Sequence, residues 1–182
     1  KLGCKLIDLV CVNLYPFQQT VDKGADFETI VENIDIGGPS MLRSAAKNFE
    51  RVTVVTDPSD YARVLKELRL NGKVSKLTRL ELSAKAFSHT AAYDAAISQQ
   101  MNERAGRRTM DLAGGPIAIG GTPELTLRYG ENPHQKAVLF KSSGLLPKGM
   151  LAMKKLSGKE LSYNNLGDME TAMAVVREFG PD

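Results

Sequence analysis

The chain has 182 residues, 42% of them hydrophobic and 25% charged, which is typical of a globular protein with a sizeable core. Its 24 basic and 21 acidic side chains give a net charge of +3 and are scattered, so no basic stripe indicates a nucleic-acid partner. No apolar run is long enough to span a bilayer, and no signal peptide opens the sequence. We therefore expect a cytoplasmic protein that binds neither nucleic acid nor membranes.

Strand and helix patterns alternate at short spacing in the first half of the sequence. In chain order they are a strand at 7–12, a turn at 13–17, a helix at 27–34, a helix starting near Gly38, a strand at 52–55 and a helix at 61–70. Pro16 forces the chain out of the first strand, and Asn71-Gly72 is a stop signal for the last helix. This alternation predicts an α/β layer with a mainly parallel sheet, in which the first strand is interior.

The first half ends with a long helix from 77 to about 104, after which the character of the sequence changes. The predicted elements that follow are a glycine- and proline-rich connector at 105–126, a strand at 137–140, a loop at 141–149 and a helix at 168–179. The connector leaves little room for a continuous element, so we place the domain boundary there. Asp168 is the predicted cap of the last helix. The long helix has a predicted apolar face: Leu80, Ala84, Phe87, Ala91, Ala95 and Ile97.

The two cysteines give no sign of a metal site. Cys4 and Cys11 have no His and no second Cys pair close by in the sequence, so we expect buried free thiols and no bound metal. The sequence begins at Lys1, just before an apolar run, and ends at Asp182, just after a helical pattern. We interpret it as a fragment.

The junction at 32–49 carries the most informative pattern. Asp35 is followed by the pair Gly37-Gly38 and by a helix that includes Lys47. A helix N-terminus offers unpaired N–H groups and partial positive charge, so such a junction can present donors, a carboxylate and an ammonium to one anionic ligand. The alternative is an ordinary capped amphipathic helix whose charged face is solvated, with Asp35 as its cap. Spacing alone does not decide between these interpretations.

Five motifs in this order resemble those of the bifunctional purine biosynthesis proteins that combine AICAR formyltransferase with IMP cyclohydrolase. They are Asn-Leu-Tyr-Pro-Phe at 13–17, Ile-Asp-Ile-Gly-Gly-Pro-Ser at 34–40, Ala-Ala-Lys-Asn at 45–48, Arg-Tyr-Gly-Glu-Asn-Pro-His-Gln at 128–135 and Leu-Ser-Tyr-Asn-Asn-Leu at 161–166. Each motif is weak alone, but together they cover almost the whole chain except the connector. The resemblance is therefore specific.

The resemblance implies a divided molecule. Residues 1–104 resemble the later part of the cyclohydrolase domain, whose fold in the family is methylglyoxal-synthase-like with a parallel sheet. Residues 127–182 resemble the start of the transformylase domain, which is cytidine-deaminase-like, and 105–126 connects the two. The family's phosphate-gripping loop and its transformylase lysine-histidine pair have no counterpart here. We therefore expect both sites to be incomplete and the chain alone to be marginally stable and inactive.

For the cyclohydrolase site, the resemblance assigns catalytic roles to Lys47, Asp35 and Tyr15. Lys47 matches the acid/base lysine, Asp35 the carboxylate beside the reacting groups, and Tyr15 a residue on the oxyanion side. Ring closure requires proton removal from a poor nucleophile and protonation of a departing hydroxyl, which suits a carboxylate and an ammonium. Tyr15 could also be only a half-buried aromatic residue. Four further positions match nucleotide contacts: Val12, Asn13, Ile36 and Gly37.

For the transformylase site, the resemblance assigns nucleotide binding to Arg128, Tyr129 and Asn165, with His134 as a weaker candidate. An arginine fork and an aromatic ring suit a phosphorylated ligand, whereas the alternative is a structured turn between domains. The implied co-substrate is 10-formyltetrahydrofolate, and the cyclohydrolase needs no cofactor. The implied ligands are AICAR, formyl-AICAR and IMP, and the implied assembly is a homodimer. A non-catalytic interaction module, or another α/β nucleotide-binding protein, remains as an alternative.

Overall fold

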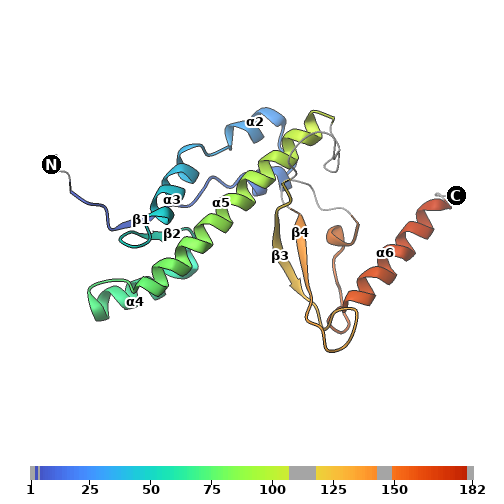
Figure 1. Cartoon of the computed structure of the whole chain (residues 1–182). Helices are drawn as coiled ribbons and strands as arrows, with labels where there is room; N and C mark the ends of the chain where they lie inside the picture. The colour runs from blue at the N-terminus through green and yellow to red at the C-terminus, as the bar shows by residue number, and fades with distance from the viewer. Residues whose placement is uncertain (1–2, 4, 107–117, 143–148, 180–182) are drawn as a thin grey trace.

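The structure is a computed structural model that describes residues 3, 5–106, 118–142 and 149–179. It is a mixed α/β arrangement in which a long helix, α5 (Lys76–Arg104), runs past most of the other elements (Figure 1). None of the described helices combines the length and the apolar character needed to cross a membrane.

A small parallel sheet lies at the centre of the first half. It consists of β1 (Leu9–Cys11) and β2 (Thr53–Val55), with Val10 opposite Val54. The helix α3 (Gly37–Lys47) joins α5 in packing against β2. The buried core between these elements and α4 consists of Leu42, Ala45, Ala46, Val54, Val55, Val64, Val74, Leu82 and Ala86. The sequence-based expectation of an α/β layer with parallel strands is confirmed for this part.

Two short helices cover the later part of α5. They are α1 (Phe17–Asp22) and α2 (Phe27–Glu32), and Asp26 caps α2 by accepting a hydrogen bond from the Thr29 N–H at 2.8 Å. A second buried cluster holds them to α5, through Phe17, Val21, Ile30, Tyr93 and Ala96. The segments at 13–17 and 33–35 therefore lie over the same stretch of α5.

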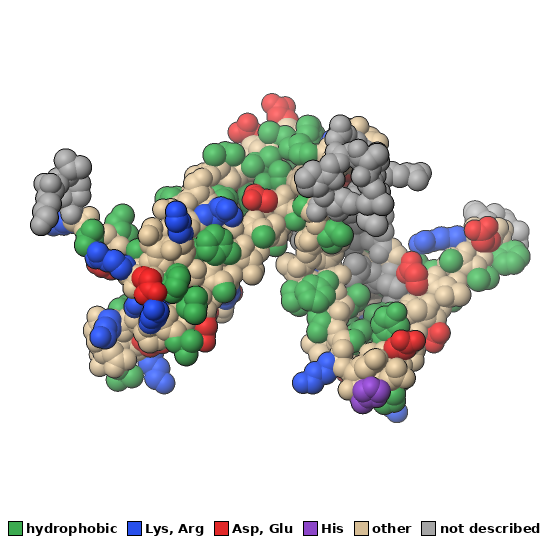
Figure 2. All heavy atoms as spheres, viewed as in Figure 1, with side chains coloured by type: hydrophobic (Ala, Val, Ile, Leu, Met, Phe, Trp, Pro, Cys, Tyr) green, Lys and Arg blue, Asp and Glu red, His purple; other side chains and the backbone are tan. Residues whose placement is uncertain are grey.

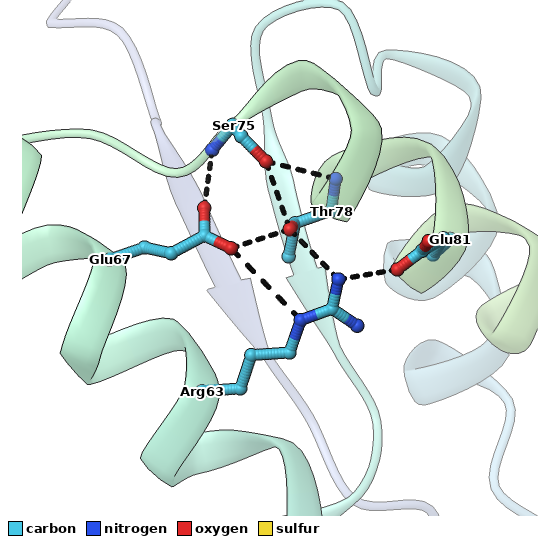
Figure 3. Close-up of polar contacts among 5 residues, drawn as sticks. All are labelled: Arg63, Glu67, Ser75, Thr78 and Glu81. Atoms are coloured by element: carbon cyan, nitrogen blue, oxygen red, sulfur yellow. Dashed lines mark hydrogen bonds and ion pairs between the residues drawn. The ribbon is translucent and has the colours of Figure 1, made fainter.

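A polar network fixes the turn between α4 (Tyr61–Asn71) and α5 (Figure 3). The Glu67 carboxylate accepts hydrogen bonds from the Ser75 N–H at 2.6 Å and from the Thr78 hydroxyl at 2.5 Å. Ser75 in turn caps α5 by accepting from the Thr78 N–H. Gly72 ends α4 with φ of 65°, a left-handed conformation that glycine adopts at little cost. A short 3-10 turn, η1 (Pro58–Asp60), precedes α4.

The second half contains an antiparallel pair and a helix. The strands are β3 (Gly121–Thr126) and β4 (Val138–Ser142), with an irregularity in register between Pro123 and Leu125. The turn η3 (Gly149–Ala152) and α6 (Tyr163–Glu178) follow. The strand pair touches the first half, because Lys141 forms an ion pair with Asp22 at 2.7 Å and the Ser142 hydroxyl donates to the Gln99 side chain at 3.2 Å.

Several expectations about individual elements were wrong. The first strand is not interior: among the described residues it pairs only with β2, which leaves Cys11 and Leu9 exposed. Cys4 lies outside the described residues. The connector at 105–126 does contain a continuous element, β3, because strand pairing with β4 tolerates Pro123 at the irregularity. Residues 107–117 of the connector lie outside the described part.

The helix α6 begins at Tyr163 instead of Asp168, because Ser162 is its cap.

The predicted apolar face of α5 was also wrong at four of its positions. Ala84, Ala91, Leu80 and Phe87 are exposed, and the face that meets α3 and the sheet carries Leu82 and Ala86 instead. Arg43 stacks over the Phe87 ring at 5.6 Å. Hydrophobic side chains are exposed on both halves of the molecule (Figure 2).

Candidate functional site

The first candidate site lies where β1 and β2 end and α3 begins. Val12 continues the ladder by donating its N–H to the Val55 carbonyl at 3.0 Å. Asn13 follows. Its side-chain NH2 group donates to the Thr56 backbone carbonyl at 3.2 Å, and its side-chain oxygen accepts from the Tyr61 hydroxyl at 3.4 Å. Because the carboxyl ends of parallel strands share one edge of a sheet, these residues lie where α/β proteins bind ligands.

Asp35 is held at the N-terminus of α3. One carboxylate oxygen accepts from the Gly38 N–H at 2.7 Å, and the other accepts from the Tyr15 N–H at 3.4 Å. Ile36, which precedes the helix, makes no capping hydrogen bond of its own, so Asp35 takes the role of cap. An added Cβ at position 38 would lie 2.4 Å from the Asp35 carboxylate, so a side chain there would force the carboxylate or the helix start to shift. The capping interpretation is therefore correct, and it coexists with a carboxylate at the predicted site.

The neighbours of Asp35 are open to solvent. The side chains of Tyr15 and Ile36 are 56% and 77% exposed, and Gly37 is exposed as well. A Cβ at Gly37 would meet nothing within 4 Å, unlike one at Gly38. This edge of the molecule thus brings together six of the predicted residues of the cyclohydrolase site: Val12, Asn13, Tyr15, Asp35, Ile36 and Gly37.

Lys47 lies at the other end of α3. The helix has 11 residues, so its two ends are roughly 16 Å apart at a rise of about 1.5 Å per residue. Lys47 is exposed and belongs to none of the ion pairs found among the described residues. The structure therefore does not bring the Lys47 ammonium into contact with the Asp35 carboxylate. At this position the positive charge of the ammonium also stabilises the C-terminal end of α3, which carries partial negative charge.

Sequence reasoning missed Tyr93 of α5. The Asp35 N–H donates to the Tyr93 hydroxyl at 2.8 Å, and that hydroxyl donates to the Asn33 carbonyl at 3.2 Å. Burial raises the pKa of Tyr93 above its usual value, so the hydroxyl stays neutral near pH 7. The available signal was the helical spacing of Thr90, Tyr93 and Gln100, polar side chains that all point into the protein.

A second missed cluster stands beside Asn13. Lys85 of α5 donates to Asp57 at 2.8 Å and to Asp60 at 2.6 Å. These hydrogen bonds hold the pKa of Asp57 well below its usual range, and they raise the pKa of Lys85. The cluster ties the segment after β2 to α5, next to Thr56, whose carbonyl holds Asn13.

The second candidate site joins two segments of the second half. The Arg128 N–H donates to the Leu161 carbonyl at 2.7 Å, and the Tyr163 N–H donates to the Tyr129 carbonyl at 3.1 Å. The Arg128 guanidinium stacks over the Tyr129 ring, 5.0 Å from its centre. The structure thus places the predicted motifs at 128–135 and 161–166 side by side.

Asn165 has a structural partner at this site. Its side-chain oxygen accepts from the N–H and the hydroxyl of Ser162 at 3.1 and 3.0 Å, which forms a capping box at the start of α6. Its amide NH2 group forms none of the hydrogen bonds found among the described residues. His134 lies on the exposed loop that Gly130 and Gln135 close with a hydrogen bond of 2.9 Å, and the described contacts do not link it to Arg128 or Asn165.

Comparison with known proteins gives consistent matches. A family model described as "AICARFT/IMPCHase bienzyme" matches residues 45–182. The chain is similar to the Bifunctional purine biosynthesis protein PurH of Bacillus cytotoxicus, with 47% identity over 180 residues, covering 98% of this chain and 34% of that protein. The PurH protein of Limosilactobacillus reuteri is 48% identical over 182 residues, with the same coverage. The chain thus spans about a third of the length of these curated relatives.

Among solved structures, one described as "Crystal structure of ForH" is 40% identical in sequence, with a TM-score of 0.44. The match covers 56% of this chain and 53% of that chain.

Proposed function

The chain belongs to the AICARFT/IMPCHase bienzyme family, and we propose that it acts as part of an enzyme for the last two steps of IMP synthesis. In the first step a formyl group passes from 10-formyltetrahydrofolate to AICAR. In the second step formyl-AICAR closes its ring with loss of water to give IMP. We infer a cytoplasmic homodimer for the complete protein on the basis of family membership.

Residues 1–104 form part of the cyclohydrolase domain in this proposal, and 127–182 form part of the transformylase domain. The parallel pair β1 and β2, with α3 and α5 packed against β2, supports a methylglyoxal-synthase-like sheet. The pair β3 and β4 with α6 would begin the cytidine-deaminase-like domain. The exposed edge of β1 and the exposed apolar side chains support the expectation that these residues alone are marginally stable and inactive.

The observation that carries the cyclohydrolase role is the position of Asp35. Its carboxylate lies at the N-terminus of α3, where it accepts hydrogen bonds from the Gly38 and Tyr15 N–H groups beside the exposed residues Ile36 and Gly37. In the proposed reaction the carboxamide nitrogen attacks the formyl carbon, and Asp35 accepts the proton that this nitrogen loses. As the new C–N bond forms, the formyl C=O bond opens to an oxyanion, which takes up a proton to become a hydroxyl. This hydroxyl departs as water after a second protonation, while the formamido nitrogen loses its proton and the ring C=N bond forms.

Lys47 supplies the proton for the departing hydroxyl in the proposal. Side chains on a helix tilt toward its N-terminus, so an extended Lys47 side chain would reach back along α3 from the C-terminal end of the helix. The exposed residues Ser40, Arg43 and Ser44 share its face of the helix. A nucleotide lying along this face would reach both ends of α3, with Val12, Asn13, Ile36 and Gly37 as its contacts at the Asp35 end. Tyr15 would stabilise the oxyanion.

The test is the Lys47→Ala variant of the complete protein, with the formation of IMP from formyl-AICAR as the measurement. Removal of a general acid lowers kcat by roughly 100- to 1,000-fold. Lys66→Ala is the matched control, because Lys66 is also an exposed helical lysine but lies on α4. Formyl transfer to AICAR should be unchanged in both variants. Ring closure at the wild-type rate in Lys47→Ala would refute the role of Lys47.

The second site is proposed to bind the AICAR nucleotide without doing chemistry. Arg128 would contact the phosphate or the ring of the nucleotide, and Tyr129 would stack on the ring. The NH2 group of Asn165, which has no hydrogen-bond partner among the described residues, would donate to the nucleotide. His134 is a weaker contact, because it lies on the exposed loop. A cavity of about 460 Å3 between β4 and the start of α6 adjoins Tyr163 and Asn164, which leaves room for a ligand or for more of the domain.

One observation favours a non-catalytic alternative. Leu77, Leu80 and Phe87 form an exposed row on α5, with exposed fractions of 65%, 46% and 37%, as an association helix would. In that case the complete protein would assemble through α5 and bind no nucleotide. Calorimetric titration of the complete protein with IMP distinguishes the proposed enzyme from this alternative, because only the enzyme would bind IMP saturably.

A further inference from the structure

The hydroxyl of Tyr93 connects two points of the segment that carries Asp35. It accepts a hydrogen bond from the Asp35 N–H at 2.8 Å and donates to the carbonyl of Asn33 at 3.2 Å. Asn33 is the C-cap of α2, and Asp35 lies just before α3. The Asn33 carbonyl and the Asp35 N–H lie between the two helices, and the Tyr93 hydroxyl is the hydrogen-bond partner of both. The path of the chain into Asp35 is therefore set by a side chain from α5.

The ring of Tyr93 fixes the opposite side of the same site. It packs edge-on against Phe17, with ring centres 6.0 Å apart and planes at 65°. Phe17 is 1% exposed and follows Tyr15 and Pro16 directly, and its N–H donates to the Tyr15 carbonyl at 2.8 Å. Tyr93 thus contacts both segments whose meeting point is the hydrogen bond from the Tyr15 N–H to the Asp35 carboxylate.

We propose that Tyr93 is a positioning residue for ring closure, which holds the Asp35 carboxylate and the turn at Tyr15 in one fixed relation. The inference rests on the proposed cyclohydrolase function, because it acts through Asp35. Tyr93 is only 9% exposed and is screened from a ligand by the segments it supports, so it does not touch the reacting atoms. Its hydroxyl is neutral near pH 7, which allows it to accept one hydrogen bond and to donate another.

A positioning role and a merely structural role predict different kinetics. If Tyr93 only fills the core, its loss lowers the thermal stability of the protein and leaves kcat of the folded fraction unchanged. If it positions Asp35, its loss lowers kcat and leaves the KM for formyl-AICAR nearly unchanged, because the nucleotide contacts at Asn13 and along α3 remain. A fall in kcat with an unchanged KM therefore indicates the positioning role, and a fall in thermal stability with an unchanged kcat indicates a merely structural role.

The experiment uses Tyr93→Phe in the complete protein, with IMP formation as the assay. We expect kcat to fall about tenfold, the effect of one lost hydrogen bond on the transition state, with KM within about twofold. The matched control is Thr90→Val, which removes another buried hydroxyl from α5. Thr90 is 0% exposed and bonds only to the Phe87 carbonyl of its own helix among the described residues. Its kcat should equal that of the wild type.

A second variant tests the ring contact. Phe17→Leu keeps the Tyr93 hydroxyl and removes the edge contact, so kcat should fall about threefold. This variant also decides the matter if Tyr93→Phe is too unstable to assay, since an unchanged kcat in Phe17→Leu would then overturn the proposal. In either variant the formyl-transfer rate reports whether the rest of the protein is folded.

Asp35→Asn separates this inference from the proposed function. If Asp35→Asn loses ring closure and Tyr93→Phe behaves like Thr90→Val, only the positioning role fails. If Asp35→Asn closes the ring at the wild-type rate, the proposed role of Asp35 fails, and the positioning role fails with it. The supporting result is that Tyr93→Phe costs tenfold in the wild-type background and nothing further in the residual activity of Asp35→Asn.

Discussion

The carboxylate of Asp35 and the backbone of Gly38 approach each other so closely that a side chain at position 38 has no space. The Gly38 N–H donates to Asp35 at 2.7 Å, and a Cβ on Gly38 would lie 2.4 Å from the other carboxylate oxygen and 2.6 Å from the Leu14 side chain. Glycine at position 38 therefore lets the carboxylate keep this orientation, and the helix cap and the proposed proton acceptor are the same group.

Gly38→Ala should displace Asp35 and so impair ring closure. A misplacement of about 1 Å at a reacting group costs on the order of 100-fold in kcat, and crowding at this buried position should cost about 1–3 kcal/mol in stability. Gly37→Ala is the stability control, because a Cβ there meets nothing within 4 Å and should leave Tm unchanged or slightly higher. The measurements are Tm and the rate of IMP formation. Equal Tm values for the two alanine variants would contradict the steric explanation.

Arg128→Ala should weaken binding of AICAR and leave ring closure alone. The guanidinium lies over the Tyr129 ring, where it can face a bound nucleotide, so its loss should raise the KM of formyl transfer by roughly 10- to 100-fold with a smaller effect on kcat. Arg128→Lys keeps the charge but not the fork, and should recover only part of the affinity. Equilibrium binding of AICAR is the direct measurement. Unchanged affinity in Arg128→Ala would remove Arg128 from the site.

Sequence patterns predicted the helices α2 to α5 but not the short helix α1. The stop at Gly72 and the long helix ending at Arg104 are both observed, because glycine in a left-handed conformation and sustained helical spacing are local signals. The apolar face of α5 was not predictable in this way. Leu80 and Phe87 lie on one stripe and Leu82 and Ala86 on another, and only the position of α3 and β2 decides which stripe is buried.

The candidate site was predictable only in part, for the same reason. Asp35 and Tyr15 are 20 residues apart in sequence, and their meeting depends on α1 and α2 packing on α5. Tyr93 contacts Asp35 from 58 residues away, so its helical spacing with Thr90 and Gln100 indicates a buried polar side chain but does not indicate its partner. Lys47 shares a helix with the Asp35 cap, but the helix length separates the two groups, which a one-dimensional pattern does not show.

Glu67→Gln should lower stability and remove one source of acid sensitivity. Hydrogen bonds from the Ser75 N–H and then the Thr78 hydroxyl hold the pKa of Glu67 below its usual 4.5. A lowered pKa in the folded state means that the stabilisation is complete above about pH 4.5 and is lost as the pH falls through the folded pKa. We expect a loss of about 1 kcal/mol near pH 7, and a smaller difference between wild type and variant at pH 3 to 4.

The control for this prediction is Glu50→Gln. Glu50 pairs with Lys76 at 2.7 Å, but the two side chains are 60% and 64% exposed, so the change should stay within roughly 0.5 kcal/mol at any pH. Thermal unfolding of both variants across this pH range is the measurement. A Glu67→Gln deficit that stays constant from pH 7 to pH 3 would show that the charge of Glu67 is not what stabilises the turn.

Asn165 has two proposed roles that one substitution can separate. Its side-chain oxygen completes the capping box with Ser162, and its NH2 group, which has no partner among the residues that the structure describes, is proposed to donate to the nucleotide. Asn165→Asp keeps the acceptor and favours the helix N-terminus, so Tm should be maintained, but it removes the donor and adds negative charge near a phosphorylated ligand. Asn165→Ala removes both functions and should also cost about 1 kcal/mol of stability. We therefore expect both variants to bind AICAR more weakly, and only the alanine variant to melt earlier. Wild-type affinity in Asn165→Asp would show that the residue serves only as a cap.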